Sequence, residues 1–213
     1  DHEAWAAVSG YAIVALALFA TWALLAGVGR MALQRRRTGD SGFRFAAATA
    51  GSRQWWANRI SAAGSVLVGV AAPVADLLGL DAVAPTLSAP SLRTAAAVVA
   101  AAGVVATYLA QLAMGTAWRI GVDPTERTDL VTSGPFALVR NPIFTAALIT
   151  FTGLALTTAN AVALSGLVVV HAGIQMQVRA VEEPHLLATH GQAYAHYAAR
   201  VGRFLPWIGR LRR

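Results

Sequence analysis

The sequence of 213 residues contains no cysteine, which excludes disulfides, thiolate nucleophiles and metal sites built on cysteine. No other residue pattern suggests a metal, so we expect none. Lysine is absent too, since all 17 positively charged side chains are arginine. Charged residues make up only 13% of the chain, whereas 56% of it is hydrophobic. A soluble globular domain carries about 25% charged residues, so the composition indicates an integral membrane protein.

Motifs of several common enzyme classes are missing as well. The chain has no G-x-G-x-x-G, P-loop or H-E-x-x-H motif, so a Rossmann domain, a nucleotide-phosphate loop and an intramembrane metalloprotease have no support. The net charge of +7 would suit a nucleic-acid partner, but the arginines lie at the ends of apolar stretches, where they orient membrane proteins. We therefore expect membrane lipids, and no nucleic acid, as partners.

Five apolar stretches are candidates for membrane spans. A hydrocarbon core about 30 Å thick requires about 20 apolar residues in a helix. The stretches cover residues 4–31, 60–80, 91–114, 142–157 and 161–178. The last two are short, and only residues 158–160 separate them, so we expect a tight helical hairpin. The fold class we predict is all-α integral membrane, with about five transmembrane helices and a C-terminal cytoplasmic helix over 182–201.

The arginines also predict an orientation. They concentrate at 30–59, 119–140 and 179–213, so the positive-inside rule puts the N-terminus outside and the C-terminus in the cytoplasm. Asp1-His2-Glu3 lacks a basic n-region, so we expect the first stretch to be retained as a span. Arginine-only usage with abundant alanine suggests a bacterial protein, hence the inner membrane. The basic segment 200–213 is expected to lie on lipid headgroups.

Polar residues inside a span are costly and are functional candidates. His171, Gln175, Arg179 and Glu182 follow helical spacing along one face of the last span, which predicts the lining of a polar cavity. The alternative is that His171 and Gln175 bond only to a neighbouring helix while Arg179 pairs with Glu183. Because the adjacent carboxylates of Glu182 and Glu183 repel each other, we expect a positive group to compensate them.

A second feature is the stretch 128–144, in which a Gly-Pro turn, an arginine and an Asn-Pro helix start follow one another. With its surroundings this stretch resembles the isoprenylcysteine carboxyl methyltransferase family of membrane methyltransferases, which is related to the phospholipid N-methyltransferases. The elements that carry the resemblance are Met114-Gly115, Trp118-Arg119, Leu130 to Phe136, Arg140 to Phe144, Glu182-Glu183, Gly191, Tyr194, Tyr197 and Arg203 to Pro206.

The resemblance implies a non-Rossmann pocket for S-adenosylmethionine at the cytoplasmic face, closed by the C-terminal helix, with S-adenosylhomocysteine as product. The cofactor-binding residues that it implies are Thr128, Asp129, Leu130, Val131, Gly134, Pro135, Phe136, Asn141, Pro142, Ile143, Phe144, Glu182, Glu183, Tyr194 and Tyr197. The candidate catalytic residues are Arg119, Arg140, Arg179 and Glu182. The candidate substrate-binding residues are Arg179, Gln175 and His171.

Three positions depart from the family pattern. Asn141 stands where the family usually has histidine, Phe144 replaces a tyrosine, and Phe136 stands where eukaryotic members often have tyrosine. Asparagine forms hydrogen bonds but is no general base near neutral pH, and each phenylalanine lacks a hydroxyl. These changes preserve cofactor stacking better than proton transfer through this region.

The resulting hypothesis is carboxyl O-methylation of a lipophilic, isoprenylcysteine-like acceptor that enters laterally between helices. One alternative is N-methylation of a phospholipid or small amine, which would need Glu182, Glu183 or His171 as a base. Another is a non-enzymatic transporter or scaffold that uses the polar face of the last span. We divide the chain into N-terminal spans at 1–113, with a loop at 34–59, and a methyltransferase core at 114–213. The sequence leaves the oligomeric state open.

Overall fold

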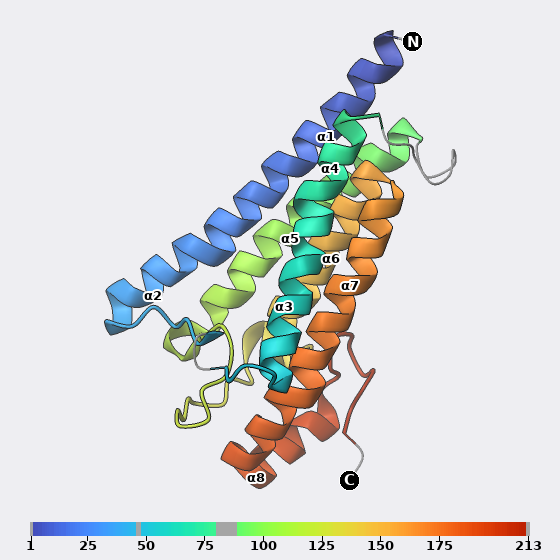
Figure 1. Ribbon diagram of the computed structural model, residues 1–213. Coiled ribbons are helices and arrows are strands. Elements are labelled where there is room, and N and C mark those ends of the chain that lie inside the picture. Colours follow the sequence, from blue (N-terminus) through green and yellow to red (C-terminus); the bar gives the residue numbers. More distant parts are fainter. Residues whose placement is uncertain (1, 46–47, 80–88, 212–213) are drawn as a thin grey trace.

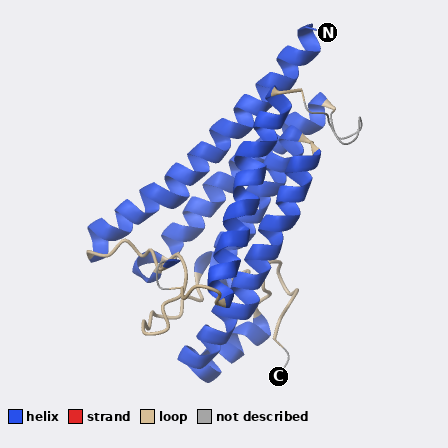
Figure 2. Ribbon diagram, in the orientation of Figure 1, coloured by secondary structure: helices blue, strands red, loops and turns tan. Residues whose placement is uncertain are grey.

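The computed structural model describes residues 2–45, 48–79 and 89–211, and within these ranges it contains helices and loops but no strand (Figures 1 and 2). Three of the helices are joined to the next helix through a short π-helical segment. The first runs from α1 (His2–Trp22) through Ala23–Gly29 to α2 (Arg30–Thr38), and the second from α3 (Arg53–Val66) through Leu67–Ala71 to α4 (Ala72–Leu77). Then follow α5 (Pro90–Ala113), α6 (Pro142–Thr158), and α7 (Ala161–Gln177), which continues through Val178–Glu182 into α8 (Glu183–Arg200).

Within the described residues, four helical stretches are long and apolar enough to cross a membrane, namely Gly10–Thr38, Arg53–Leu77, Pro90–Ala113 and Ala161–Arg200. The helix α6 is apolar but shorter. The prediction of an all-helical, multi-pass membrane protein is therefore confirmed. In the last stretch, Ala161–Arg200, we assign residues 161–178 to the membrane span, because charged residues follow Val178.

Several element boundaries differ from the prediction. The first helix continues past Met31 to Thr38 and ends at Gly39, whose φ of 78° is left-handed. The second helix begins earlier, at Arg53, because the side chain of Ser52 caps it by accepting a hydrogen bond from the backbone N–H of Trp55. The predicted end at Leu80 lies outside the described residues. The C-terminal helix is not separate, since the π-helical segment makes α7 and α8 continuous.

The predicted helical hairpin is formed by α6 and α7. Proline at the first position, Pro142, starts α6, where its missing N–H costs nothing. Ala159 ends the helix with a φ of 56°. The side chain of Asn160 then caps α7 by accepting a hydrogen bond of 2.9 Å from the N–H of Ala163. The two caps therefore fix a reversal of chain direction between adjacent helices.

Glycines let the helices pack in close pairs. A Cβ atom added to Gly103 of α5 would lie 2.7 Å from the backbone nitrogen of Thr150 in α6, and one added to Gly153 would lie 2.5 Å from that of Ala100. Gly64 meets Val170 in the same way, which brings α3 against α7. Because lipid gives no hydrophobic drive for helix association, such backbone contact is a main source of packing energy.

A buried ion pair fastens the end of the bundle that lies opposite α8 (Figure 1). Arg93 of α5 contacts Asp76 of α4 at 2.5 Å, and Asn160 donates to the same carboxylate at 2.9 Å. Arg93 also donates to the carbonyls of Thr157 and Thr158 at 2.6 and 3.0 Å. The ion pair thus joins α4 and α5 to the α6–α7 turn, far from the end that carries α8.

We predict that Arg93→Met lowers the free energy of unfolding by about 3 to 5 kcal/mol, because it leaves the buried Asp76 carboxylate unpaired. The double variant Asp76→Asn, Arg93→Met should recover a large part of this loss, since it removes both charges. Arg200→Met, at an exposed position of α8, is the matched control. Denaturant titration in detergent measures the effect, and equal stability of the Arg93 and Arg200 variants would contradict it.

Candidate functional site

A cavity of about 550 Å³ lies between the helices in the half of the bundle that carries α8. Its volume is within the range of about 300 to 1,000 Å³ that is typical of small-molecule sites. Most of the predicted cofactor residues line it, namely Thr128, Asp129, Leu130, Val131, Phe136, Asn141, Pro142, Ile143, Phe144, Glu182, Tyr194 and Tyr197. In the described part of the chain, Gly134, Pro135 and Glu183 do not. Residues from the chain between α5 and α6, from α6, from the π-helical segment before α8 and from α8 are therefore brought to one wall.

Behind this wall, Glu183 is buried between two arginines. Its Oε1 accepts hydrogen bonds from Arg140 Nη2 at 2.5 Å and Arg203 Nε at 2.7 Å, and its Oε2 accepts one from Arg203 Nη2 at 2.9 Å. Burial alone would raise the pKa of Glu183, but these hydrogen bonds hold it below its usual range. The predicted positive compensation is confirmed for this glutamate. We call Arg140, Glu183 and Arg203 the tail clamp.

The tail clamp also holds the chain after α8. The Arg140 guanidinium donates to the carbonyls of Ala198, Val201 and Gly209. The side chain of Asn141 donates to the carbonyl of Arg203 at 3.1 Å. Arg203 is thus part of the protein interior, whereas the sequence had assigned it to lipid headgroups. Residues 201–209 are fixed against the start of α6.

Two tyrosines join α8 to the loop before α6. The Tyr197 hydroxyl donates a 2.6 Å hydrogen bond to the carbonyl of Phe136, and the rings of Tyr194 and Tyr197 lie edge to face with centroids 6.1 Å apart. Phe136, Tyr194 and Tyr197 are all buried. Because these contacts hold α8 beside the loop, the helix forms part of the cavity wall.

The neighbouring glutamate, Glu182, has a different environment. It lines the cavity, and its hydrogen bond comes from the neutral side chain of Gln177, at 3.2 Å. Among the described residues no arginine or histidine lies within ion-pair distance of it. Burial raises the pKa of Glu182 to about 7, and the nearby charge of Glu183 adds to the shift. The wall therefore presents a carboxylate that lacks a positive partner.

His171, Gln175 and Arg179 are not brought to this cavity. They form a row along the outside of α7, in which Arg179 donates to Gln175 at 2.7 Å and Gln175 lies 3.2 Å from His171. None of the three is part of the described cavity lining. The π-helical segment Val178–Glu182 explains the difference, because its wider turn rotates Glu182 away from the face that regular helical spacing predicts.

Arg119 lines the cavity, but its guanidinium is engaged in a loop network. It contacts Glu126 at 3.1 Å and donates to the carbonyls of Thr116 and Trp118. Arg44 also contacts Glu126 and pairs with Asp40. The hydrogen bond from Arg44 to Asp40 holds the pKa of Asp40 well below its usual range. The network ties the loop after α2 to the loop after α5. Both loops contribute to the cavity wall.

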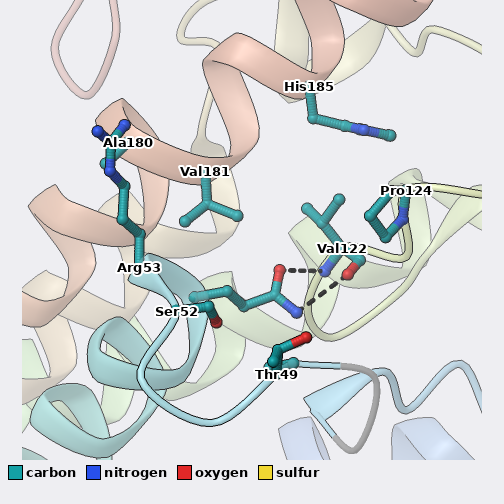
Figure 3. Close-up of a pocket in the computed structure, with 10 residues that line it drawn as sticks. Thr49, Ser52, Arg53, Val122, Pro124, Ala180, Val181 and His185 are labelled. Carbon is teal, nitrogen blue, oxygen red and sulfur yellow. Dashed lines mark hydrogen bonds between the residues drawn. The ribbon is translucent and has the colours of Figure 1, made fainter.

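A smaller cavity of about 370 Å³ adjoins the loop after α5 (Figure 3). Val122 and His185 line both cavities, and Figure 3 shows His185 above Val122 on the same side of the view. The side chain of Gln54, in α3, donates to the carbonyl of Val122 at 2.9 Å and accepts from its N–H at 3.1 Å. One side chain of α3 therefore fixes the backbone of the loop segment that separates the two spaces.

Sequence reasoning missed several polar residues on the wall of the larger cavity, and four of them lie in four different helices. Trp22, Asn58, Gln111 and Gln177 belong to α1, α3, α5 and α7 respectively. Because they lie in separate helices, no spacing along the chain connects them. The sequence offered only a general signal, namely that a polar side chain inside an apolar helix is energetically costly and is therefore a candidate functional residue.

Comparison with known proteins gives one family match. Residues 92–193, just under half of the chain, match the family model described as phospholipid methyltransferase. The matched segment includes α5, the loop 128–144, the α6–α7 hairpin and the Glu182-Glu183 pair, and it ends just before Tyr194. The matched family is related to the isoprenylcysteine methyltransferases that the motifs resemble. No curated protein matches the chain.

We predict that Glu183→Gln releases the chain after α8, because it removes the negative charge that Arg140 and Arg203 share. Trypsin cleavage after Arg203 should become about tenfold faster or more, as expected when a local opening becomes easier. Glu182→Gln, the adjacent and chemically identical change outside the tail clamp, should leave the cleavage rate unchanged.

The same release should occur in the unchanged protein in acid. The pKa of Glu183 is depressed in the folded chain, so the stability it contributes is present above the ordinary carboxyl pKa of about 4.3 and is lost as pH falls below it. Pepsin cleavage measured between pH 4.5 and pH 2, divided at each pH by the cleavage rate of an unstructured peptide, tests this. Equal protection of the two glutamine variants, or no loss of protection in acid, would contradict the role of the tail clamp.

We predict that Gln54→Leu loosens the loop that carries Val122. The variant removes both hydrogen bonds to that backbone, each worth about 1 kcal/mol, so exchange of the Val122 amide hydrogen should become about tenfold faster. Hydrogen exchange followed by mass spectrometry measures the change, with Gln192→Leu on the exposed face of α8 as control. Unchanged exchange at Val122 would show that other contacts hold the loop.

Proposed function

We propose that the chain is a membrane enzyme that methylates a lipophilic acceptor, because residues 92–193 match the phospholipid methyltransferase family model and that family uses S-adenosylmethionine. The observation that carries the proposal is the Glu182 carboxylate, which lines the cavity without a positive partner among the described residues. The cofactor carries an α-ammonium and a sulfonium. A positive group bound beside Glu182 would supply the missing partner where water is scarce and charges attract strongly.

The rest of the wall fits such a cofactor. Leu130, Val131, Phe136 and Phe144 give it apolar and aromatic surface, which suits an adenine ring and a thioether chain. Asn141 holds the carbonyl of Arg203, a task that needs an amide donor and no proton transfer. This accounts for the tolerance of asparagine at a position where the family usually has histidine.

The cofactor supplies a methyl group on a positively charged sulfur, which an acceptor oxygen or nitrogen attacks in line. The chain's residues orient the two partners and exclude water from the apolar half of the cavity. Arg119 and Arg140 line the cavity, and the Nε atom of Arg140 has no hydrogen-bond partner in the described residues. We assign these two arginines to orientation of a negatively charged acceptor. Arg179, which lies on the outer row, takes no direct part.

The acceptor that we favour is a carboxylate on a lipophilic molecule, because an anionic oxygen needs no base. The alternative is N-methylation of a phospholipid or small amine, in which a proton must leave the nitrogen. Glu182, with a pKa of about 7, is then the group that accepts it. The transporter alternative loses support, because His171, Gln175 and Arg179 form an exposed row instead of a path into the cavity.

We further propose that the four long helical stretches and α6 make five crossings, with the N-terminus outside and α8 in the cytoplasm of a bacterium. The cavity then lies in the cytoplasmic half, open to the soluble cofactor. A lipophilic acceptor reaches it laterally between helices. The segment 114–213 supplies most of the cofactor wall, and 1–113 supplies the remaining helices that surround the acceptor.

We predict that Glu182→Gln weakens S-adenosylmethionine binding about 10- to 100-fold, the usual value for a hydrogen-bonded charge. Because the unpaired Glu182 has a pKa of about 7, binding to the unchanged protein should release a proton in acid, and affinity should fall about tenfold per pH unit below about 7. The glutamine variant should show no such pH dependence. Titration calorimetry from pH 5.5 to 8 measures both effects.

Two outcomes would overturn the proposed function. One is the absence of measurable S-adenosylmethionine binding by the folded protein. The other is binding that Glu182→Gln leaves unchanged at every pH. S-adenosylhomocysteine, which lacks the sulfonium charge, serves as a comparison ligand and separates the contribution of the ammonium from that of the sulfonium.

A further inference from the structure

Apart from Arg140 Nε, four polar atoms of cavity-lining residues have no hydrogen-bond partner in the described part of the chain. They are the donors Trp22 Nε1 and Asn58 Nδ2 and the acceptors Gln111 Oε1 and Gln177 Oε1. The four come from four different helices, α1, α3, α5 and α7. We call these residues the polar ring. A buried polar group without a partner is unfavourable, and four at one cavity require an explanation.

The two glutamines are firmly oriented. Gln111 and Gln177 are each only 5% exposed. The amide nitrogen of Gln111 donates to the carbonyl of Ala26 at 2.9 Å, and that of Gln177 donates to Glu182 at 3.2 Å. Because each nitrogen is engaged within the protein, each oxygen stays available as an acceptor. The site is therefore built into the packing of the helices.

The polar ring and its immediate neighbours carry no formal charge, apart from Glu182 beside Gln177. The other polar neighbours on the wall are the hydroxyls of Ser61, Ser65 and Thr107. Arg30 lies behind this part of the wall, with its guanidinium 4.5 Å from the centroid of the Trp118 ring and bonded to Gln34 and to the Gly115 carbonyl. The ionisable groups of the lining lie in the chain between α5 and α6, in the π-helical segment before α8, and in α8.

We propose that the polar ring binds an uncharged polar group of the lipophilic methyl acceptor, one that both donates and accepts hydrogen bonds, such as a hydroxyl, a phenol or an amide. The proposal rests on the proposed function and narrows its substrate class. Paired donors and acceptors satisfy such a group in full. A phosphate or a quaternary ammonium at the same depth would lose its hydration without gaining a charged partner, so the ring rejects it.

The depth of the polar ring supports this assignment. Trp22, Asn58 and Gln111 lie within three of the stretches that are apolar enough to cross a membrane. The exposed apolar side chains of Leu24 and Leu109 lie two residues from Trp22 and Gln111 respectively. A molecule whose alkyl chain stays in lipid beside these side chains therefore has its head group close to the polar ring.

The test compares C16 probes that differ only in head group. Hexadecanol, hexadecanamide and 1-fluorohexadecane are titrated into the full chain, with and without S-adenosylmethionine, and bound probe is counted by native mass spectrometry. All three probes are uncharged, so Arg119, Arg140 and Glu182 do not decide between them. The alcohol and the amide should bind at least about tenfold more tightly than the fluoroalkane, the factor expected for one or two hydrogen bonds. Gln111→Met, Asn58→Leu and Trp22→Phe should each reduce this preference.

Gln192→Met, at an exposed glutamine of α8, should keep the full preference. Since the three ring variants are in different helices, any one that fails to fold leaves the other two as tests, and unchanged S-adenosylmethionine binding shows that a variant is intact. Equal binding of all three probes, a preference for the fluoroalkane, or a preference for the alcohol and the amide that survives in the folded ring variants overturns the proposal. Head-group preference without any cofactor binding would support the polar ring and defeat the proposed function instead.

Discussion

The ion pairing of Glu183 is the interaction on which the α8 end of the molecule depends. One carboxylate receives hydrogen bonds from Arg140, just before α6, and from Arg203, beyond α8. Without that charge, two arginines would face each other in the interior, and the cost of burying them would fall on the segment they join. The same arginine at 140 satisfies three carbonyls of the returning chain. The position of α8 and of the chain after it therefore depends on these charged hydrogen bonds as well as on apolar packing.

Glu182 and Glu183 are adjacent residues of the same type, but Glu183 holds the structure together whereas Glu182 faces the cavity. Glu183 is paired with arginine and is ionised, whereas Glu182, one position earlier, has only an amide neighbour and a raised pKa. The difference arises from direction, because the end of the π-helical segment turns one side chain toward the arginines and the other toward the cavity. Pairs of titratable groups held in unlike environments are typical of functional sites.

Local rules predicted the helices, and the family resemblance implied much of the wall, but neither predicted the contacts between distant segments. The apolar stretches, Pro142 and the Asn160 cap act over a few residues, so the sequence reveals them directly. The prediction that His171, Gln175 and Arg179 share a face with Glu182 was wrong because the π-helical turn between Val178 and Glu182 changes the direction of the Glu182 side chain. No residue pattern in the sequence indicates that turn. Arg203 was assigned to lipid for a related reason, since its partner is 20 residues away and depends on how the tail folds back.

The continuity of α7 and α8 has a mechanical consequence. The stretch Ala161–Arg200 has 40 residues, a contour of about 60 Å at 1.5 Å per residue, or about twice the thickness of the hydrocarbon core. One half is held by lipid and the other half carries Tyr194 and Tyr197, with a bend at Gly191 instead of a flexible linker. Because the same continuous helical stretch lies in the membrane and forms part of the cavity wall, a change in the tilt of α7 in the bilayer would also move Tyr194 and Tyr197.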